Sequence, residues 1–140
     1  MVWRNRPEGS GGNLRTYILL RLPSGLLATR IALQGSLEVN RAKVVLDTGA
    51  IYTVLHPKFL ERIGAVAAGT IPVRTLERTL NLPVFTVERL SVFGATFSRH
   101  PILAYTPAAF TPGIDGILSI DILRSLAARL DFASGTIVIP

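Results

Sequence analysis

The sequence predicts an all-β fold, a closed or partly closed barrel of short strands with one or two short helices. Most apolar runs are short and end at glycine or proline, which is typical of strands joined by turns. Helical spacing occurs in only two segments, residues 57–63 and 120–130. Of the 140 residues, 49% are apolar and 17% are charged, which is the balance of a folded domain with a core.

Strands are expected along most of the chain, each bounded by a turn signal. The first covers residues 17–22 and ends at Pro23-Ser24-Gly25. Residues 42–46 form an apolar run that is expected to be buried on both faces, with a turn at Asn40-Arg41 leading into it. Gly94 and Pro101 are expected to separate later strands. The remaining predicted strands are residues 29–34, 37–39, 70–76, 82–89, 90–93, 102–105 and 136–139.

The two helices have recognisable ends. Pro57 suits the first position of a helix, and Gly64 can end that helix. The second helix is expected over residues 120–130, where apolar residues recur at helical spacing. Ser119 stands directly before it and is expected to cap its N-terminus.

Both histidines and four of the phenylalanines are expected to have structural roles. His56 lies beside the first helix, and His100 is expected in a loop because Pro101 follows it. Four phenylalanines are expected in the core: Phe85, Phe93, Phe97 and Phe132.

The chain divides into a polar arm of residues 1–16 and one domain of residues 17–140. A further loop is expected at 107–113. No apolar run approaches the roughly 18–20 residues of a membrane span, and the charged N-terminus is not followed by a signal-type apolar stretch. A cytoplasmic protein without a membrane partner is therefore expected.

Composition excludes several kinds of chemistry. The chain has no cysteine, which excludes disulfides, zinc–thiolate sites and thiol catalysis. Two histidines are too few for a His-rich metal site, and no metal or organic cofactor is expected. The net charge is +6, but the arginines are scattered singly, which favours solvated surface charge over a nucleic-acid interface.

The sharpest chemical feature is Asp47-Thr48-Gly49, directly after the apolar run. A carboxylate at the end of a buried strand is costly unless it is hydrogen-bonded or used in chemistry. Gly49 permits a tight turn that offers backbone N–H groups to the carboxylate, and the Thr48 hydroxyl can both donate and accept. An ordinary turn is the alternative reading of this tripeptide.

Residues 44–55 resemble the catalytic loop of retropepsin-like aspartic proteases, in which two apolar residues precede Asp-Thr-Gly-Ala. Residues 114–123 resemble the family's Asp-Gly-Ile-Leu-Gly motif, which leads into a helix, although Ser119 replaces the final glycine. The ending, residues 130–139, is similar to the closing strands of bacterial members. The resemblance covers residues 17–139 and implies the retropepsin barrel.

The resemblance implies an aspartic endopeptidase in which Asp47 is the catalytic carboxylate, supported by Thr48 and Gly49. Because this chain carries a single Asp-Thr-Gly motif, the second carboxylate must come from another copy, which implies a homodimer with two-fold symmetry. The two Asp47 carboxylates would share one proton and activate a water molecule that attacks the peptide bond. By the same resemblance, residues 136–139 would pair with the second copy.

The resemblance also implies a β-hairpin flap over an extended peptide or protein substrate. Its expected tip is Thr75-Leu76-Glu77-Arg78-Thr79, which contains no glycine, although such tips are commonly glycine-rich in the family. Ala50, Ile51 and Leu76 are expected to bind substrate.

Two other functions remain open at this point. The first is a catalytically weak or inactive dimerisation or peptide-binding module on the same fold, which the unusual flap tip and Ser119 would suit. The second is a basic β-barrel that binds RNA or DNA, which the net charge of +6 would suit.

Overall fold

The computed structural model describes residues 14–106 and 112–140, so the arm as far as residue 13 and most of the loop expected at 107–113 lie outside the described residues. In the described ranges, no helix is long and apolar enough to cross a membrane. The helices are α1 (Pro57–Ile63) and α2 (Ile120–Ser125). The strands are β1 (Arg15–Ile18), β2 (Leu20–Arg21), β3 (Leu27–Gln34), β4 (Val39–Asp47), β5 (Val54–Leu55), β6 (Val66–Arg74), β7 (Thr79–Val92), β8 (Ala95–Ala104), β9 (Gly116–Ser119), β10 (Arg129–Asp131) and β11 (Thr136–Ile139).

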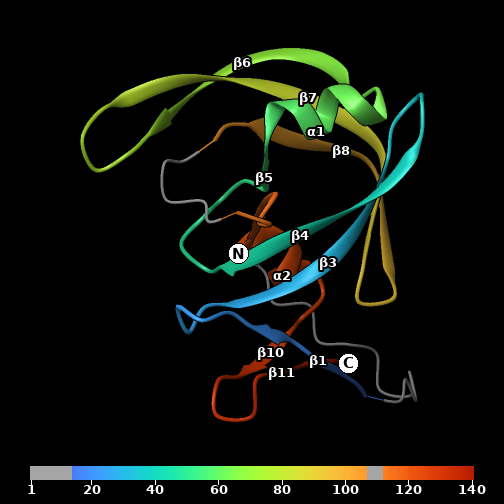
Figure 1. The fold of residues 1–140 in the computed structure, drawn as a ribbon, viewed down its shortest axis with the longest axis vertical. Helices are drawn as coiled ribbons and strands as arrows, with labels where there is room; N and C mark the ends of the chain where they lie inside the picture. The colour runs from blue at the N-terminus through green and yellow to red at the C-terminus, as the bar shows by residue number, and fades with distance from the viewer. Residues whose placement is uncertain (1–13, 107–111) are drawn as a thin grey trace.

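Six strands close into a barrel. Their order is β3-β4-β9-β5-β8-β7, and an additional pairing of β3 with β7 closes the ring. Strand β2 extends the sheet beyond β3, and β6 extends it beyond β7, where the long β6–β7 hairpin arches over the barrel (Figure 1). The all-β barrel with short helices that the sequence predicts is therefore confirmed.

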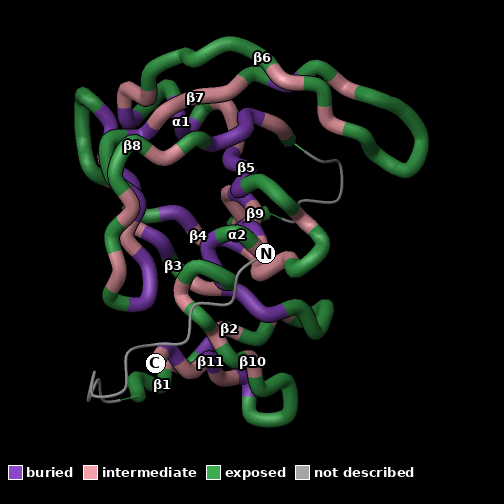
Figure 2. Tube along the Cα trace, turned by 180° about the vertical axis from the view of Figure 1, so that it is seen from behind, coloured by how far each residue is buried: buried purple, intermediate pink, exposed green. Residues whose placement is uncertain are grey.

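The barrel encloses an apolar core, drawn in purple in Figure 2. Strands β3, β4 and β9 contribute fully buried side chains such as Ile31, Val44 and Leu118. Helix α1 packs its apolar face on this core through Leu60 and Ile63. This burial fixes the register of the strands that carry the site, because a one-residue slip would turn the apolar side chains of a strand outward.

A second, three-stranded sheet lies at the opposite end of the molecule from the hairpin, in the order β1-β11-β10 (Figure 1). It begins at Arg15, so the first strand starts inside the stretch that the sequence assigns to the arm. Strand β11 is central and pairs with β1 on one side and with β10 on the other. Residues 136–139 therefore have both edges occupied by their own chain, against the expectation that they pair with a second copy.

The prediction of a turn at Asn40-Arg41 is wrong, because both residues lie inside β4. The chain turns instead at residues 35–38, where the Gly35 N–H donates to the Glu38 carbonyl at 3.1 Å. A Cβ at Gly35 would collide with the Ile63 carbonyl oxygen, so only glycine fits this close approach to the end of α1. The strand expected over 37–39 is consequently part of this turn and the start of β4.

The strands expected at 82–89 and 90–93 are one continuous strand, β7. The predictions of a loop at His100 and of a strand break at Pro101 are also wrong, since both residues lie inside β8. Pro101 pairs with Thr86 of β7, and on its other side β8 pairs with β5 only at Leu103 and Ala104. Proline is tolerated there because the strand has a single hydrogen-bonded neighbour at that point.

Helix α1 begins at Pro57 and ends at Gly64 as predicted, with Gly64 in the left-handed conformation at φ 75°. Helix α2 is shorter than the predicted 120–130, because Ala127 adopts φ 50° and the chain then enters β10. Ser119 occupies the N-cap position but makes no side-chain capping bond. Phe132 is 68% exposed, which contradicts its predicted place in the core.

The other three phenylalanines behave as expected. Phe93 is buried, and Phe85 and Phe97 pack against the core. The Phe93 ring also lies against Tyr17 of β1, with 5.3 Å between ring centroids, which joins the three-stranded sheet to the barrel.

Candidate active site

The Asp-Thr-Gly segment follows β4, whose last residue is Asp47. The carboxylate Oδ1 of Asp47 accepts the Gly49 N–H at 2.9 Å, and its carbonyl accepts the Ala50 N–H at 3.2 Å. A Cβ at Gly49 would lie only 3.3 Å from the same Oδ1, so a side chain at this position would crowd the carboxylate. The turn thus holds one carboxylate oxygen and leaves a partly exposed acid at the end of a barrel strand.

The second motif lies directly beside the first. Strand β9 runs parallel to β4 with Asp47 in register with Ser119. Behind the catalytic loop, the Ser119 hydroxyl lies 3.0 Å from the Thr53 hydroxyl, and Thr53 Oγ1 also accepts the Ser119 N–H at 3.2 Å. Both side chains are about 1% exposed. The Ile120 N–H donates to the Ala50 carbonyl at 2.9 Å, which completes the connection between the two motifs.

The start of the second motif fixes β9 against its neighbours. Asp115 Oδ2 accepts the Lys43 N–H of β4 at 2.8 Å. Gly116 follows, and a Cβ there would collide with the Val54 carbonyl oxygen of β5. Only glycine therefore lets β9 lie between β4 and β5 at this separation.

The β6–β7 hairpin forms a flap whose tip is residues 75–78, within the range expected from the sequence. The Thr75 hydroxyl donates to the Arg78 carbonyl at 2.8 Å. Its oxygen accepts the backbone N–H groups of Glu77 and Arg78 at 3.3 and 3.1 Å. A threonine side chain thus closes this turn, and no residue of the tip has to be glycine.

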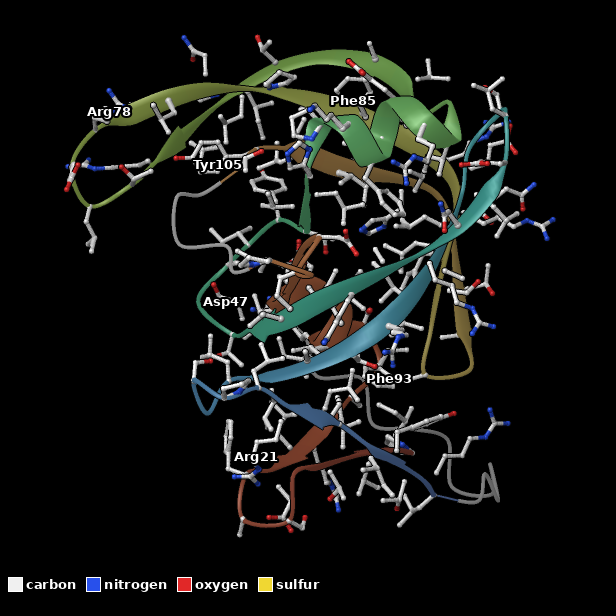
Figure 3. The ribbon with its side chains drawn as sticks, viewed as in Figure 1. Arg21, Asp47, Arg78, Phe85, Phe93 and Tyr105 are labelled. Carbon is white, nitrogen blue, oxygen red and sulfur yellow. The ribbon has the colours of Figure 1, made fainter. Side chains whose placement is uncertain are left out.

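A cavity of about 600 Å³ separates the catalytic loop from the flap. In Figure 3, Asp47 and Tyr105 lie on the side of the molecule toward which the flap tip, marked by Arg78, extends. Asp47 and Arg74 are the charged residues among those that line the cavity. The lining residues are Asp47, Gly49, Ala50, Ile51, Tyr52, Val54, Pro72, Val73, Arg74, Thr75, Leu80, Leu82, Leu103 and Tyr105.

The structure brings four of the six residues proposed from the sequence to this cavity: Asp47, Gly49, Ala50 and Ile51. Thr48 points to the other side of the loop, where it lines two further hollows. Leu76 stands fully exposed at the flap tip and does not line the cavity.

Sequence reasoning missed Arg74 and Tyr105 as cavity residues. Arg74 ends the strand before the flap tip, so the flap assignment could have suggested it. No feature of the neighbouring sequence indicates that Tyr105 is a cavity residue. It is held at the cavity because its N–H donates to the Leu55 carbonyl at 3.1 Å.

Two ionisable side chains that do not line this cavity, Asp131 and His100, have a lowered pKa. Asp131 Oδ1 accepts the N–H groups of Ala133 and Ser134 at 3.0 and 3.2 Å, which fixes the β10–β11 turn. Hydrogen bonds from the backbone and side chain of Ser134 lower the pKa of Asp131. Burial lowers the pKa of His100, which the negative charge of Asp121 partly opposes.

One Asp-Thr-Gly loop at the end of a barrel strand, facing a cavity under a β-hairpin, defines the retropepsin-like class of folds. Comparison with known proteins agrees with this class. A family profile described as "Aspartyl protease" matches residues 31–122, and the chain belongs to that family. No curated protein sequence matches the chain.

Two solved structures share the fold. A retropepsin-like aspartic protease from Rickettsia conorii has 16% sequence identity and a TM-score of 0.62, with 91% of each chain covered. EIAV protease, in complex with the inhibitor HBY-793, has 19% identity and a TM-score of 0.56 over 76% of this chain and 92% of that one. At such identities the likeness is one of fold.

Proposed function

We propose that this chain is an aspartic endopeptidase that acts as a homodimer, in which each copy supplies one Asp47. The observation that carries the proposal is the placement of Asp47 at the end of β4, with one carboxylate oxygen held by Gly49 and the residue lining a cavity of about 600 Å³ beneath a flap. Aspartic proteolysis needs two carboxylates that share a proton. The second motif holds no carboxylate at this position, because Ser119 is the residue in register with Asp47.

In the proposed reaction, the ionised Asp47 takes a proton from a water molecule held between the two carboxylates. The protonated Asp47 of the other copy donates to the oxygen of the scissile carbonyl, and the water adds to the carbonyl carbon. The product is a tetrahedral diol. In its collapse, the Asp47 that took the proton from water donates it to the amide nitrogen, and the other Asp47 takes a proton back from a diol hydroxyl. The C–N bond then breaks to give an amine and a carboxylic acid, without a covalent enzyme intermediate. Gly49 keeps the Asp47 carboxylate in place through its N–H bond to Oδ1.

The proposed substrate is an extended peptide, because strands β6 and β7 lie above the cavity and can offer backbone groups to a strand-like ligand. Ala50 and Ile51 would contact it from below. Leu76 at the flap tip would reach it only if the hairpin closes, since its side chain is fully exposed here.

The test compares the wild-type protein with Asp47→Asn on a peptide library at acidic and neutral pH, with pepstatin-type inhibition alongside. Asp121→Asn is the matched control, because it makes the same chemical change on an exposed residue of α2. Cleavage that is lost only in Asp47→Asn supports the proposal. Equal cleavage by both variants would refute it.

A second candidate is a peptide-binding module on the same fold without useful proteolysis. Its support is the flap tip, where the Thr75 hydroxyl closes the turn with three hydrogen bonds in place of a glycine hinge. Peptide binding by both wild type and Asp47→Asn, with cleavage by neither, would favour this candidate.

A further inference from the structure

A second hollow, of about 370 Å³, lies where the end of the β7–β8 hairpin meets β3 and β4. Arg30 and Arg41 are the charged residues that line it, so it is called the basic hollow below. It shares no lining residue with the cavity under the flap. Figure 3 shows Asp47 at the left of the barrel and Phe93, which lines the basic hollow, at its right. The basic hollow is therefore separate from the candidate active site.

Strand register gathers cations here that are scattered along the sequence. Ala32 of β3 pairs with Arg41 of β4 on one side and with Ser91 of β7 on the other, so the three side chains form one row. Arg30 lies two residues from Ala32, on the same face of β3, and pairs directly with Lys43. Like charges directly opposite each other across a strand pair are destabilising. The fold thus maintains a positive cluster that costs stability unless an anion binds it.

The rim of the basic hollow supplies further hydrogen-bond donors. A Cβ at Gly94 would lie 2.5 Å from Arg15 Nη1 and 3.0 Å from the Tyr17 hydroxyl, so a third guanidinium from β1 lies against this lining residue. On the β7–β8 side, the hydroxyls of Ser91 and Thr96 lie 3.1 Å apart. One hydrogen bond uses one of their two hydrogens, which leaves the other to donate to a ligand.

Among the described residues, no acidic side chain lines the basic hollow. In the same part of the chain, the side chains of Arg30 and Arg41 have no hydrogen bond or ion pair. The nearby acids have other partners, since Glu88 Oε2 accepts from Gln34 at 3.3 Å and Asp115 Oδ2 accepts the backbone N–H of β4 described above. The described chain therefore does not supply the anion that this cluster requires.

We propose that the basic hollow binds the sugar–phosphate backbone of a single-stranded nucleic acid, without regard to base sequence. Guanidinium groups bind phosphate oxygens strongly, and hydroxyl groups also donate to them. The tetrahedral phosphate accepts donors from several directions, which suits a hollow with donors on β1, β3, β4 and β7, whereas a carboxylate accepts mainly in its own plane. The net charge of +6 attracts such a polyanion at longer range.

The same residues account for the absence of base recognition and for the preference for a single strand. Phe93 is the aromatic residue that lines the basic hollow, and it is buried, so bases find no exposed ring on which to stack. A flexible single strand can bend a phosphate into a concave site, but a duplex is stiff over many base pairs. Contacts are therefore confined to the backbone of one strand.

The first experiment measures binding of a fluorescein-labelled oligouridylate by anisotropy over a range of salt concentrations. The variant is Arg30→Ser with Arg41→Ser, and the matched control is Arg62→Ser with Arg78→Ser, which removes the same charge from exposed residues elsewhere. The slope of log Kd against log salt should fall by about 1.4 in the variant, because each phosphate contact in a single strand contributes roughly 0.7. Its Kd should rise about tenfold or more at ~0.1 M salt.

The control pair should keep the wild-type slope and nearly the wild-type affinity, and circular dichroism confirms that both variants fold. An equal loss of affinity in the two double variants would overturn the proposal, because binding would then follow net charge alone. Asp47→Asn should bind as wild type does, so this proposal does not depend on the proposed proteolysis.

The second experiment locates the ligand on the wild-type protein by NMR. Oligouridylate should shift the backbone amide signals of Gly94 and Ala95, which line the basic hollow, and leave those of Gly49 and Ala50 in the catalytic loop unchanged. Oligocytidylate should give the same shifts with similar affinity. Shifts confined to Gly49 and Ala50 would overturn the proposal.

The third experiment offers other polyanions in competition. Polyglutamate and vesicles rich in phosphatidylserine, at matched charge concentration, should displace the oligouridylate poorly, and a duplex of the same length should bind more weakly. Displacement by polyglutamate or by the vesicles at lower charge concentration than unlabelled oligouridylate would overturn the proposal and assign the basic hollow to an acidic peptide or to a membrane surface.

Discussion

The hydroxyl groups of Thr53 and Ser119 lie 3.0 Å apart, both buried, directly behind the catalytic loop. Thr53 stands six residues after Asp47 along the chain, and Ser119 is in register with Asp47 across the parallel β4–β9 pair. Ser119 replaces the glycine of the retropepsin-like motif and was expected to cap α2. Its hydroxyl instead pairs with Thr53, so it ties the two motifs together.

This pair predicts an asymmetric response to mutation. Thr53→Val removes the acceptor of the Ser119 N–H and the partner of its hydroxyl, so it should lower the free energy of unfolding by about 1–3 kcal/mol. Ser119→Gly keeps the N–H bond to Thr53 and should cost less, about 0.5–1.5 kcal/mol. Urea denaturation of both variants and the double variant measures the coupling, and strictly additive effects would contradict it.

The close approach of Gly116 to the Val54 carbonyl predicts that a larger residue at position 116 destabilises the second motif. Because a Cβ there would meet the Val54 carbonyl oxygen, Gly116→Ala should push β9 away from β5 and destabilise the fold by about 1–3 kcal/mol or more. Ile117→Val, one residue later, is the control and should cost only about 0.5–1.5 kcal/mol. Urea midpoints of the two variants compare them, and equal stability would show that β9 can shift freely.

The sequence predicts those features of the site that are local. Asp47-Thr48-Gly49, the flap tip at 75–78 and α1 depend on residues that are neighbours along the chain. The contact of Thr53 with Ser119 does not, because it arises only when β9 inserts beside β4. In the sequence, the one sign of this contact is that Ser119 stands where the family motif has glycine. That replacement does not indicate that Thr53 is the residue that Ser119 contacts.

The errors in the fold have a similar origin. Asn40-Arg41 has the composition of a turn, but Gly35 makes the turn because only glycine fits against the end of α1. The spacing of apolar residues over 120–130 fits a helix, yet Ala127 turns left-handed and Leu130 joins a strand. Phe132 is apolar but exposed, because the β10–β11 turn projects it outward. In each case tertiary contacts override a local preference.

The flap tip predicts a kinetic effect. Thr75→Val removes the hydroxyl that closes the turn, so the amides of Glu77 and Arg78 should exchange with solvent faster, and kcat/KM should fall if the proposed proteolysis holds. Thr75→Ser keeps the hydroxyl and should behave as wild type. Because the tip is exposed, the urea midpoint should change little. Unchanged amide exchange in Thr75→Val would show that the hydroxyl does not order the tip.

His100 predicts a pH dependence of stability. Burial lowers its pKa from 6.5, so between 6.5 and the folded-state value the unfolded chain binds more protons than the folded one. The free energy of unfolding should therefore be fully retained above pH 6.5 and fall as the pH drops below it. Urea midpoints measured from pH 7.5 to 5.5 should show this fall in wild type, and His100→Gln should reduce its slope.

Asp121 supplies a second test of the same effect, because its negative charge opposes the lowering of the His100 pKa. Removing that charge in Asp121→Asn should lower the His100 pKa further, which an NMR titration of the imidazole signals follows directly. The loss of stability in this variant should extend to lower pH than in wild type. A His100 pKa that rises in Asp121→Asn would show that burial and the carboxylate do not act on the imidazole in opposite directions.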